Sequence, residues 1–248
     1  MDLRVLTFNI RFDTARDGQN AWPFRREMAA ELVSSLDCHL IGFQEAMPNQ
    51  RADLEASLAG YRWIGHGRDT DHSGEQCCMA IREELEIVDS GTFWLATTPE
   101  VAGAVGWDAQ LTRICTWARL AKDGQEFTAF NAHWDHVGVQ ARVQTARLLF
   151  DRVMATPGPV LLMGDFNTTP DSEPITILRG ALQDSYADMN PGSKRGTFHG
   201  FGTQMDGDRI DYLFASPEFL IVESRILDQP EGPFPSDHYP VFARLELL

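Results

Sequence analysis

Residues 159–167 read Pro-Val-Leu-Leu-Met-Gly-Asp-Phe-Asn, directly after a Pro-Gly turn signal at 157–158. The apolar run 160–164 is too short for a helix and is typical of a strand that is buried on both faces. Asp165 and Asn167 end this stretch two positions apart, so on an extended chain their side chains point to the same side. They are then expected at the end of a sheet, where α/β enzymes tend to bind ligands. The alternative is a plain Asx turn, because Asp and Asn are ordinary turn residues.

The composition predicts a packed globular protein. The chain has 248 residues, of which 43% are hydrophobic and 23% charged, and this balance is typical of a folded core. The longest apolar runs cover only a few residues, far fewer than a transmembrane helix needs. No linker divides the chain, so we expect one domain over residues 1–248. No basic segment followed by a long apolar stretch opens the chain, so no signal peptide is visible and a cytoplasmic location is expected.

The four cysteines do not form the pattern of a zinc site or a disulfide framework. None of them is in a CxxC motif, and two are adjacent. On a strand, adjacent side chains face opposite sides. We therefore expect reduced, mostly buried thiols. The residues are Cys38, Cys77, Cys78 and Cys115.

The net charge limits the partners that the chain can bind. With 21 basic and 36 acidic residues, the formal charge is −15, and the only lysines are Lys122 and Lys194. Proteins that grip duplex DNA through its backbone usually present a basic face. We therefore expect no strong binding of duplex DNA, and a phosphorylated small molecule or a short nucleic acid as substrate. The sequence does not indicate an oligomeric state.

Hydrophobic periodicity predicts about ten short strands and about four helices. The strands do not alternate cleanly with helices, and most of them occur in antiparallel-looking runs. Two sheets packed face to face, with helices outside, would bury this many apolar strands in an α/β fold. The polar stretches 13–23 and 192–208 are predicted as loops. The predicted strands are 3–10, 39–43, 61–66, 76–82, 86–95, 111–120, 126–134, 160–164, 209–215, 219–227 and 241–248, and the predicted helices are 24–36, 48–58, 139–154 and a short one after Pro174.

Several of these strands end in groups that can bind a metal or a phosphate. Any one of them has an ordinary structural explanation as a turn or cap, but chance explains the whole set poorly. Oxygen ligands with a few histidines and no thiolates suit Mg²⁺ or Mn²⁺. Such a site fits hydrolysis at phosphorus, in which a metal polarises the phosphoryl oxygens and a carboxylate orients water. The groups are Asn9, Glu45, His133 with Asp135, Asp165 with Asn167, Asp211, and Asp237 with His238.

The same residues lie in motifs that resemble the endonuclease/exonuclease/phosphatase superfamily, which includes DNase I. The motifs occur in the order of that family and span nearly the whole chain; Gly-Asp-Phe-Asn and Ser-Asp-His are the most specific. The resemblance implies a four-layer α/β sandwich and divalent-metal phosphoesterase chemistry. The motifs are Thr-Phe-Asn-Ile at 7–10, Gln-Glu at 44–45, Asn-Ala-His-Trp-Asp-His at 131–136, Gly-Asp-Phe-Asn at 164–167, Arg-Ile-Asp-Tyr at 209–212 and Ser-Asp-His at 236–238.

The resemblance also implies roles for individual residues. Glu45 would be the main metal ligand, with Asn9 beside it, and Asp237 would bind a second metal or shape the site. Asp165 would orient or deprotonate the attacking water. The remaining roles concern the phosphate: Asn167 would hold it, His133 would reach one of its oxygens, and His238, fixed by Asp211, would contact the scissile group and stabilise the transition state.

One position departs from the pattern of the abasic-site endonucleases in this family. Their acidic ligand two residues after the first Asn is replaced here by Arg11, which cannot bind a metal and is interpreted as a phosphate clamp. His133 belongs to the histidine version of its motif, as in the DNase I, sphingomyelinase and phosphatase branches. Arg113 and Arg142 are interpreted as surface charges. The candidates for contact with the substrate are Arg11, Trp22, Trp134, Asp135 and His199.

Three functional hypotheses remain open at this point. The first is a Mg²⁺- or Mn²⁺-dependent hydrolase of a phosphodiester or a phosphomonoester, in which a metal- and Asp-oriented water attacks in line. The second is a nuclease that acts on short or single-stranded ends. The third is a catalytically silent scaffold of the same fold, which the presence of Glu45, Asp165 and His238 argues against.

Overall fold

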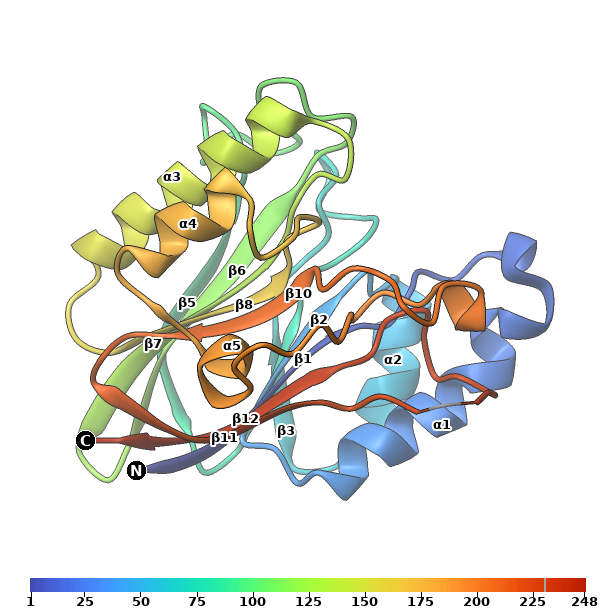
Figure 1. The fold of residues 1–248 in the computed structure, drawn as a ribbon, viewed down its shortest axis with the longest axis horizontal. Helices are drawn as coiled ribbons and strands as arrows, with labels where there is room; N and C mark the ends of the chain where they lie inside the picture. The colour runs from blue at the N-terminus through green and yellow to red at the C-terminus, as the bar shows by residue number, and fades with distance from the viewer. Residues whose placement is uncertain (230) are drawn as a thin grey trace.

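Two six-stranded sheets form the centre of the computed structural model, which describes residues 1–229 and 231–248 (Figure 1). Their strand orders are β11-β12-β1-β2-β4-β3 and β5-β6-β7-β8-β10-β9. Each sheet contains one parallel pair among its described strands, β1 with β2 and β7 with β8, and the other pairs are antiparallel. The strands are β1 Asp2–Asn9, β2 Leu40–Gln44, β3 Tyr61–Ile64, β4 Met79–Arg82, β5 Glu86–Trp94, β6 Ile114–Lys122, β7 Gln125–His133, β8 Val160–Asp165, β9 Gln183–Asp184, β10 Asp211–Ala215, β11 Phe219–Ile226 and β12 Val241–Leu247.

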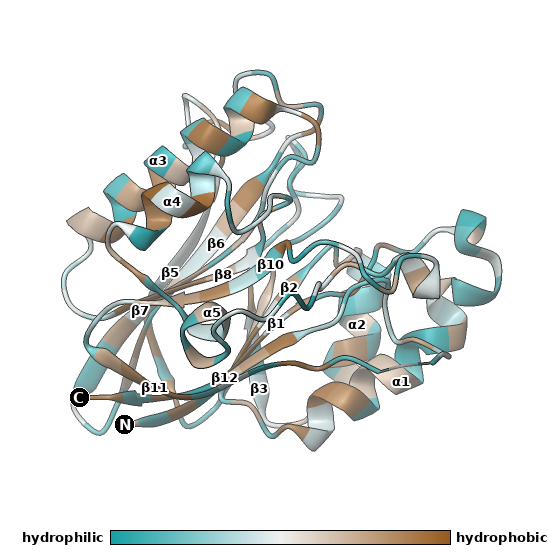
Figure 2. Cartoon of the chain, viewed as in Figure 1, coloured by the Kyte–Doolittle hydropathy of each residue, from teal (hydrophilic) through white to brown (hydrophobic). Residues whose placement is uncertain are grey.

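Helices cover the outer face of each sheet, as Figure 1 shows. Helices α1 (Trp22–Ser35) and α2 (Pro48–Ser57) pack on the first sheet, and α3 (Val139–Ala155) and α4 (Glu173–Arg179) pack on the second. A third apolar cluster lies between the sheets and takes residues from both. In Figure 2 the helices carry teal and brown turns side by side, as expected for helices with one buried face. The predicted four-layer α/β sandwich is therefore confirmed.

The two-residue period of the strands decides which side chains reach the site. In β1, Leu3 and Val5 face the other sheet, whereas Leu6 and Phe8 face the helices. The same alternation continues to Asn9, which shares the inner side with Val5. In the second sheet it turns the ends of β7, β8 and β10 inward as well. The polar ends of four strands from two sheets therefore converge at one end of the central apolar layer.

The structure differs from the sequence prediction mainly in short elements. The two-residue strand β9 and the one-turn helix α5 (Ser185–Met189) are too short to produce a periodic pattern. The predicted loop at 13–23 contains a 3₁₀ helix, Ala15–Asn20, and α1 begins at Trp22. Of the predicted strand 76–82, the part Met79–Arg82 pairs as a regular strand, whereas Gln76 makes isolated bridges to Ala46 and Gly67.

All four cysteines are buried free thiols. Burial raises the pKa of Cys38 and Cys78 to about 12, so these thiols stay protonated near neutral pH. Within the described residues, none of the helices combines the length and the apolar composition that crossing a bilayer requires.

A buried hydrogen-bond network joins the two sheets just below the site. The Asn131 side chain of β7 donates to the backbone oxygens of Phe43 (2.9 Å) and Cys78 (3.0 Å) in the first sheet. Its Oδ1 accepts a 2.6 Å bond from Gln44 Nε2, which also donates to Thr7 Oγ1 at 3.0 Å. Asn131 is fully buried, so its loss would leave two carbonyls without these partners.

Replacing Asn131 by alanine is expected to lower the free energy of unfolding by about 2–4 kcal/mol, because the hydrogen bonds between the sheets are lost and a cavity is left. Urea unfolding followed by circular dichroism measures this loss. Asn49→Ala is the matched control, since Asn49 is exposed and should change stability by less than about 0.5 kcal/mol. An Asn131→Ala protein as stable as this control would show that the network contributes nothing to the packing of the sheets.

Candidate active site

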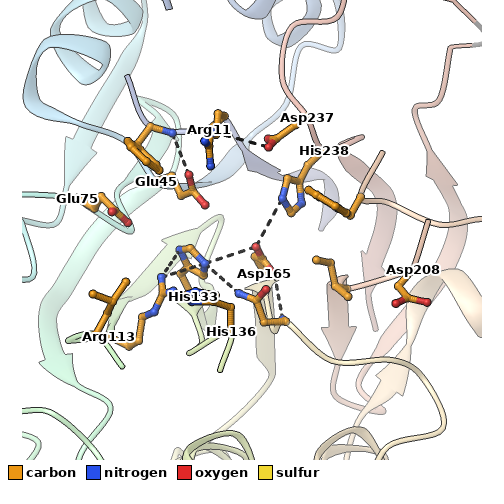
Figure 3. A pocket seen from close by; sticks show the side chains of 15 residues that line it. Arg11, Glu45, Glu75, Arg113, His133, His136, Asp165, Asp208, Asp237 and His238 are labelled. Carbon is orange, nitrogen blue, oxygen red and sulfur yellow. Dashed lines mark hydrogen bonds and ion pairs between the residues drawn. The ribbon is translucent and has the colours of Figure 1, made fainter. Parts of the chain in front are cut away.

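Two carboxylates from opposite sheets, Glu45 and Asp165, point into the same pocket (Figure 3) and meet around the amide of Asn9. Asn9 Nδ2 donates to Glu45 Oε1 at 3.1 Å and to Asp165 Oδ2 at 2.9 Å. His133 Nε2 lies 3.5 Å from the same Asp165 oxygen and 3.1 Å from Asn167 Nδ2. Residues from the ends of β1, β7 and β8 and the position after β2 are thus brought into direct contact.

A second set of groups reaches Asp165 from the opposite side. Asp211, the first residue of β10, pairs with Asp165 in the sheet register. Its Oδ2 lies 2.9 Å from His238 Nδ1, which leaves Nε2 of that ring directed toward Asp165, at 3.9 Å. Asp237 lines the same cavity, with Oδ2 at 3.9 Å from Arg11 Nε. Asp165 therefore lies between two imidazoles.

The chain leaves the extended conformation where it delivers these side chains. Asn167 has a φ of 49°, Glu45 of 60° and Arg11 of 55°, all in the left-handed region that non-glycine residues rarely adopt. The Asn167 N–H donates to Asp165 Oδ1 at 2.9 Å, so the end of β8 is an Asx turn. Asp165 therefore serves both the turn and the site: its Oδ1 accepts the hydrogen bond of the turn, and its Oδ2 accepts the one from Asn9.

Burial and neighbouring charges shift the proton affinities of the central groups. Burial, with a further contribution from Asp211, raises the pKa of Asp165 to about 7. Burial and the Arg113 guanidinium hold the pKa of His133 well below its ordinary value. Burial alone would lower the pKa of His238, but the carboxylates led by Asp211 outweigh it and hold this pKa well above the ordinary range. The site thus pairs one neutral and one protonated imidazole with a carboxyl that titrates near neutral pH.

These groups line a pocket of about 430 Å³. This volume lies in the range of small-molecule sites. The pocket includes Arg11, whose guanidinium makes two bonds to Asp17, at 3.0 and 3.1 Å. The remaining lining residues are Phe12, Glu45, Glu75, Leu111, Arg113, His133, His136, Asp165, Asn167, Phe198, Asp208, Ile210, Asp237 and His238.

Four of the candidates for substrate contact lie outside this lining. Trp134 is fully buried and stacks on Phe166 at 4.2 Å between ring centroids. Trp22, the first residue of α1, is 1% exposed and packs in the apolar cluster between the helices and the first sheet. Its Nε1 donates to Asp53. The Asp135 carboxylate accepts backbone N–H groups of both neighbouring loops, and His199 stacks on Tyr239 at 4.0 Å. The alternation along β7 turns Trp134 to the helix side and His133 to the site.

The pocket also contains residues that the sequence interpretation missed. Arg113 was interpreted as a surface charge, and this was wrong, because it is 6% exposed and lines the pocket beside His136. A signal for its position was present in the predicted hairpin. The register of that hairpin, in which Cys115 faces Ala132, brings the start of β6 beside the end of β7. Glu75, which forms a 2.7 Å ion pair with Arg68, lies on a loop without a periodic pattern.

The donor atoms fit a hard divalent cation. Glu45, His133 and Asp165 each offer one ligand atom, and these atoms lie within 4.8 Å of one another. Two carboxylates and one neutral imidazole without a thiolate suit Mg²⁺ or Mn²⁺. Asp165, Asp211 and His238 form a second such group. Asp237 belongs to neither group. Asn9 turns its N–H groups toward the carboxylates, and its Oδ1 accepts a hydrogen bond from Arg11 N–H.

A buried arginine outside the pocket fastens the two segments that carry much of the site. Arg25, on α1, is 1% exposed, and within the described part of the chain all its hydrogen bonds go to backbone oxygens. It bonds to Ile10 and Arg11 (2.7 Å) just after Asn9, to Asn20 (2.8 Å), and to Pro235 (3.0 Å), shortly before Asp237 and His238. Its fork therefore sets the spacing between the first and last parts of the chain at the site.

Replacing Arg25 by methionine is expected to lower kcat about tenfold and to destabilise the fold by about 2–4 kcal/mol, since four carbonyls lose a charged donor. Turnover measured well below the unfolding temperature separates the two effects. The matched control is Arg26→Met, at the exposed neighbouring position. Full turnover in the folded Arg25→Met protein would show that Arg25 acts on stability alone.

The chain is similar in sequence and in structure to proteins of one family. Residues 6–238 match the model of the Endonuclease/Exonuclease/phosphatase family. A structure of a protein of this family from Bacteroides vulgatus is 35% identical over 100% of both chains, with a TM-score of 0.95. A mannosyl-6-phosphatase from Bacteroides thetaiotaomicron is 33% identical over 98% of this chain and 99% of its own, with a TM-score of 0.91.

More distant structures share the fold. TDP2 from D. rerio, solved with a single-strand DNA product, is 15% identical over 99% of both chains, with a TM-score of 0.80. No curated protein matches the chain.

Proposed function

Because the chain belongs to the endonuclease/exonuclease/phosphatase family, we propose that it is a divalent-metal-dependent phosphoesterase whose substrate is a small phosphomonoester such as a sugar phosphate. The observation that carries the proposal is Asp165 itself. It lies 1% exposed at the base of a 430 Å³ pocket, between two imidazoles and beside the carboxylate of Glu45. Burial and the neighbouring Asp211 raise the pKa of this carboxyl, which makes it a stronger proton acceptor than an exposed aspartate.

The residues of the chain account for each part of a hydrolysis. Asp165 would accept a proton from the attacking water as the new bond to phosphorus forms. His238, protonated and oriented by Asp211, would donate from Nε2 to a phosphoryl oxygen. Asn167 Nδ2 donates to Trp134 O at 3.0 Å and lies 3.1 Å from His133 Nε2, so it would exchange the contact with His133 for one with the phosphate. The ester P–O bond then breaks, the leaving oxygen takes up a proton from solvent to become an alcohol, and Asp165 returns its proton to solvent. A divalent cation held by Glu45 and Asp165 would polarise the phosphoryl oxygens and favour the ionised carboxylates.

The substrate class is supported by the size of the pocket, the charge and one relative. A pocket of about 430 Å³ is of the size that holds a small molecule. The net charge of −15 disfavours a long polyanion. Among the similar structures, the mannosyl-6-phosphatase acts by its name on a sugar phosphomonoester, and it shares 33% of its sequence with this chain.

A substrate panel tests this proposal. Phosphate release from hexose 6-phosphates and p-nitrophenyl phosphate is compared with cleavage of bis-p-nitrophenyl phosphate and a fluorescent single-stranded oligonucleotide, with Mg²⁺, Mn²⁺ or EDTA. We expect turnover of the monoesters with either metal and none with EDTA. Cleavage of the oligonucleotide alone would favour the nuclease hypothesis. No turnover of any substrate with either metal would favour a silent scaffold.

A further inference from the structure

Among the described residues, no carboxylate lies at hydrogen-bond distance from the buried cation Arg113. Arg113 is 6% exposed, immediately before β6. One terminal nitrogen lies 2.9 and 3.0 Å from the ring nitrogens of His133, and the other lies 3.1 Å from His136 Nδ1. Its Nε is buried and has no hydrogen-bond partner among the described residues. Neither imidazole carries a negative charge that could compensate the guanidinium.

The carboxylates near Arg113 are already engaged. The Asp135 carboxylate lies 3.9 Å from its Nε, but it accepts hydrogen bonds from the backbone of Gln110, Leu111, Val137 and Gly138. Glu75, on the same side of the pocket, is paired with Arg68.

The other arginine of the pocket, Arg11, has a carboxylate partner at hydrogen-bond distance. Arg11 makes two bonds to Asp17. Burying a charge that has no counter-ion at hydrogen-bond distance is costly, so a buried cation of this kind that lines a pocket favours an anionic ligand. Within the described chain, Arg113 is the guanidinium of this pocket that remains available to such a ligand.

We propose that Arg113 is an anion subsite that selects phosphomonoesters over phosphodiesters. A monoester carries close to two negative charges and three terminal oxygens at pH 7, whereas a diester carries one charge and two terminal oxygens. His238 and Arg113 lie on opposite sides of Asp165, as Figure 3 shows, so they approach a phosphoryl group there from two directions. The guanidinium fork suits the additional oxygen and charge of the monoester.

This inference rests on the proposed phosphoesterase function, and it predicts a change in selectivity. Arg113→Gln is expected to lower kcat/KM for p-nitrophenyl phosphate about 10²-fold. The value for bis-p-nitrophenyl phosphate should change less than about threefold, because the diester lacks the oxygen that Arg113 holds. For p-nitrophenyl phosphate, kcat/KM of Arg113→Lys should lie between the values of wild type and Arg113→Gln, since lysine keeps the charge and loses the planar pair of donors. Arg142→Gln is the matched control, because Arg142 lies nearby on α3 and bonds to Asp135 O rather than lining the pocket.

A binding measurement keeps the test independent of turnover. Calorimetric titration with inorganic phosphate and with dimethyl phosphate, in Mg²⁺, should show that Arg113→Gln weakens phosphate at least about tenfold more than dimethyl phosphate. An equal loss for both anions, or for both esters, would overturn the selectivity, and unchanged values would overturn the subsite. If Arg113→Gln weakens phosphate more than dimethyl phosphate, but wild type hydrolyses neither ester, the subsite is supported and the proposed function is contradicted.

Discussion

Asp165→Asn is expected to lower kcat by at least about 10²-fold while leaving the fold intact, because the amide has the same shape and cannot accept the proton of water. The variant should unfold at the same temperature as wild type or higher. Asp165 is buried beside Asp211, and its ionisation is therefore opposed by burial and by a like charge. Steady-state phosphate release and thermal unfolding measure the two quantities.

The matched control is Asp171→Asn, an exposed carboxylate six positions away. It should change neither quantity measurably. An Asp165→Asn protein that keeps more than a tenth of wild-type kcat would remove Asp165 from the mechanism. A large loss of kcat together with a large loss of stability would instead indicate a structural role.

His238→Ala is expected to cost a similar factor, at least about 10² in kcat, because the donor to the phosphoryl oxygens is lost. The conservative test is Asp211→Asn. Asp211 raises the pKa of His238, so its removal lowers that pKa, and the protonated ring is lost at a lower pH. The basic limb of the pH–rate profile should therefore move to lower pH in Asp211→Asn. Rates measured from pH 5 to pH 10 in both variants check this.

Two results would contradict the role of His238. The first is near-normal turnover in His238→Ala. The second is a basic limb that stays in place in Asp211→Asn although kcat falls, which would mean that Asp211 supports the loop rather than the charge of the ring.

Much of the fold could be predicted because its strands carry a strong local signal. The run 160–164, closed by Asp165, became β8, and the positions of the helices were found from their 3.6-residue period. Strands such as β9, with two residues, have no period to detect. The start of α1 at Trp22 was missed because the polar segment before it resembles a loop.

The convergence of the strand ends was also predictable, but the contacts between them were not. Alternation along each strand explains why Asn9, His133 and Asp165 face inward and Trp134 does not. Which of these groups touch depends on how two sheets pack, and the 2.9 Å bond between Asn9 and Asp165 joins residues 156 positions apart. Arg113 was missed because a lone charged residue suggests exposure, and only the register of the predicted hairpin places the start of β6 beside the end of β7.

The measurement that tests the central claim most directly is metal removal and re-addition. The protein is stripped with EDTA, dialysed and titrated with Mg²⁺ while phosphate release from a hexose 6-phosphate is followed, in wild type and in Glu45→Gln. Losing even an outer partner of a metal site commonly weakens binding 10- to 100-fold, so a direct ligand should cost about that much or more. We predict no turnover of the stripped protein, full recovery with Mg²⁺, and a requirement for at least about tenfold more Mg²⁺ in Glu45→Gln. Undiminished turnover in EDTA, or the same Mg²⁺ dependence in both proteins, would contradict the account.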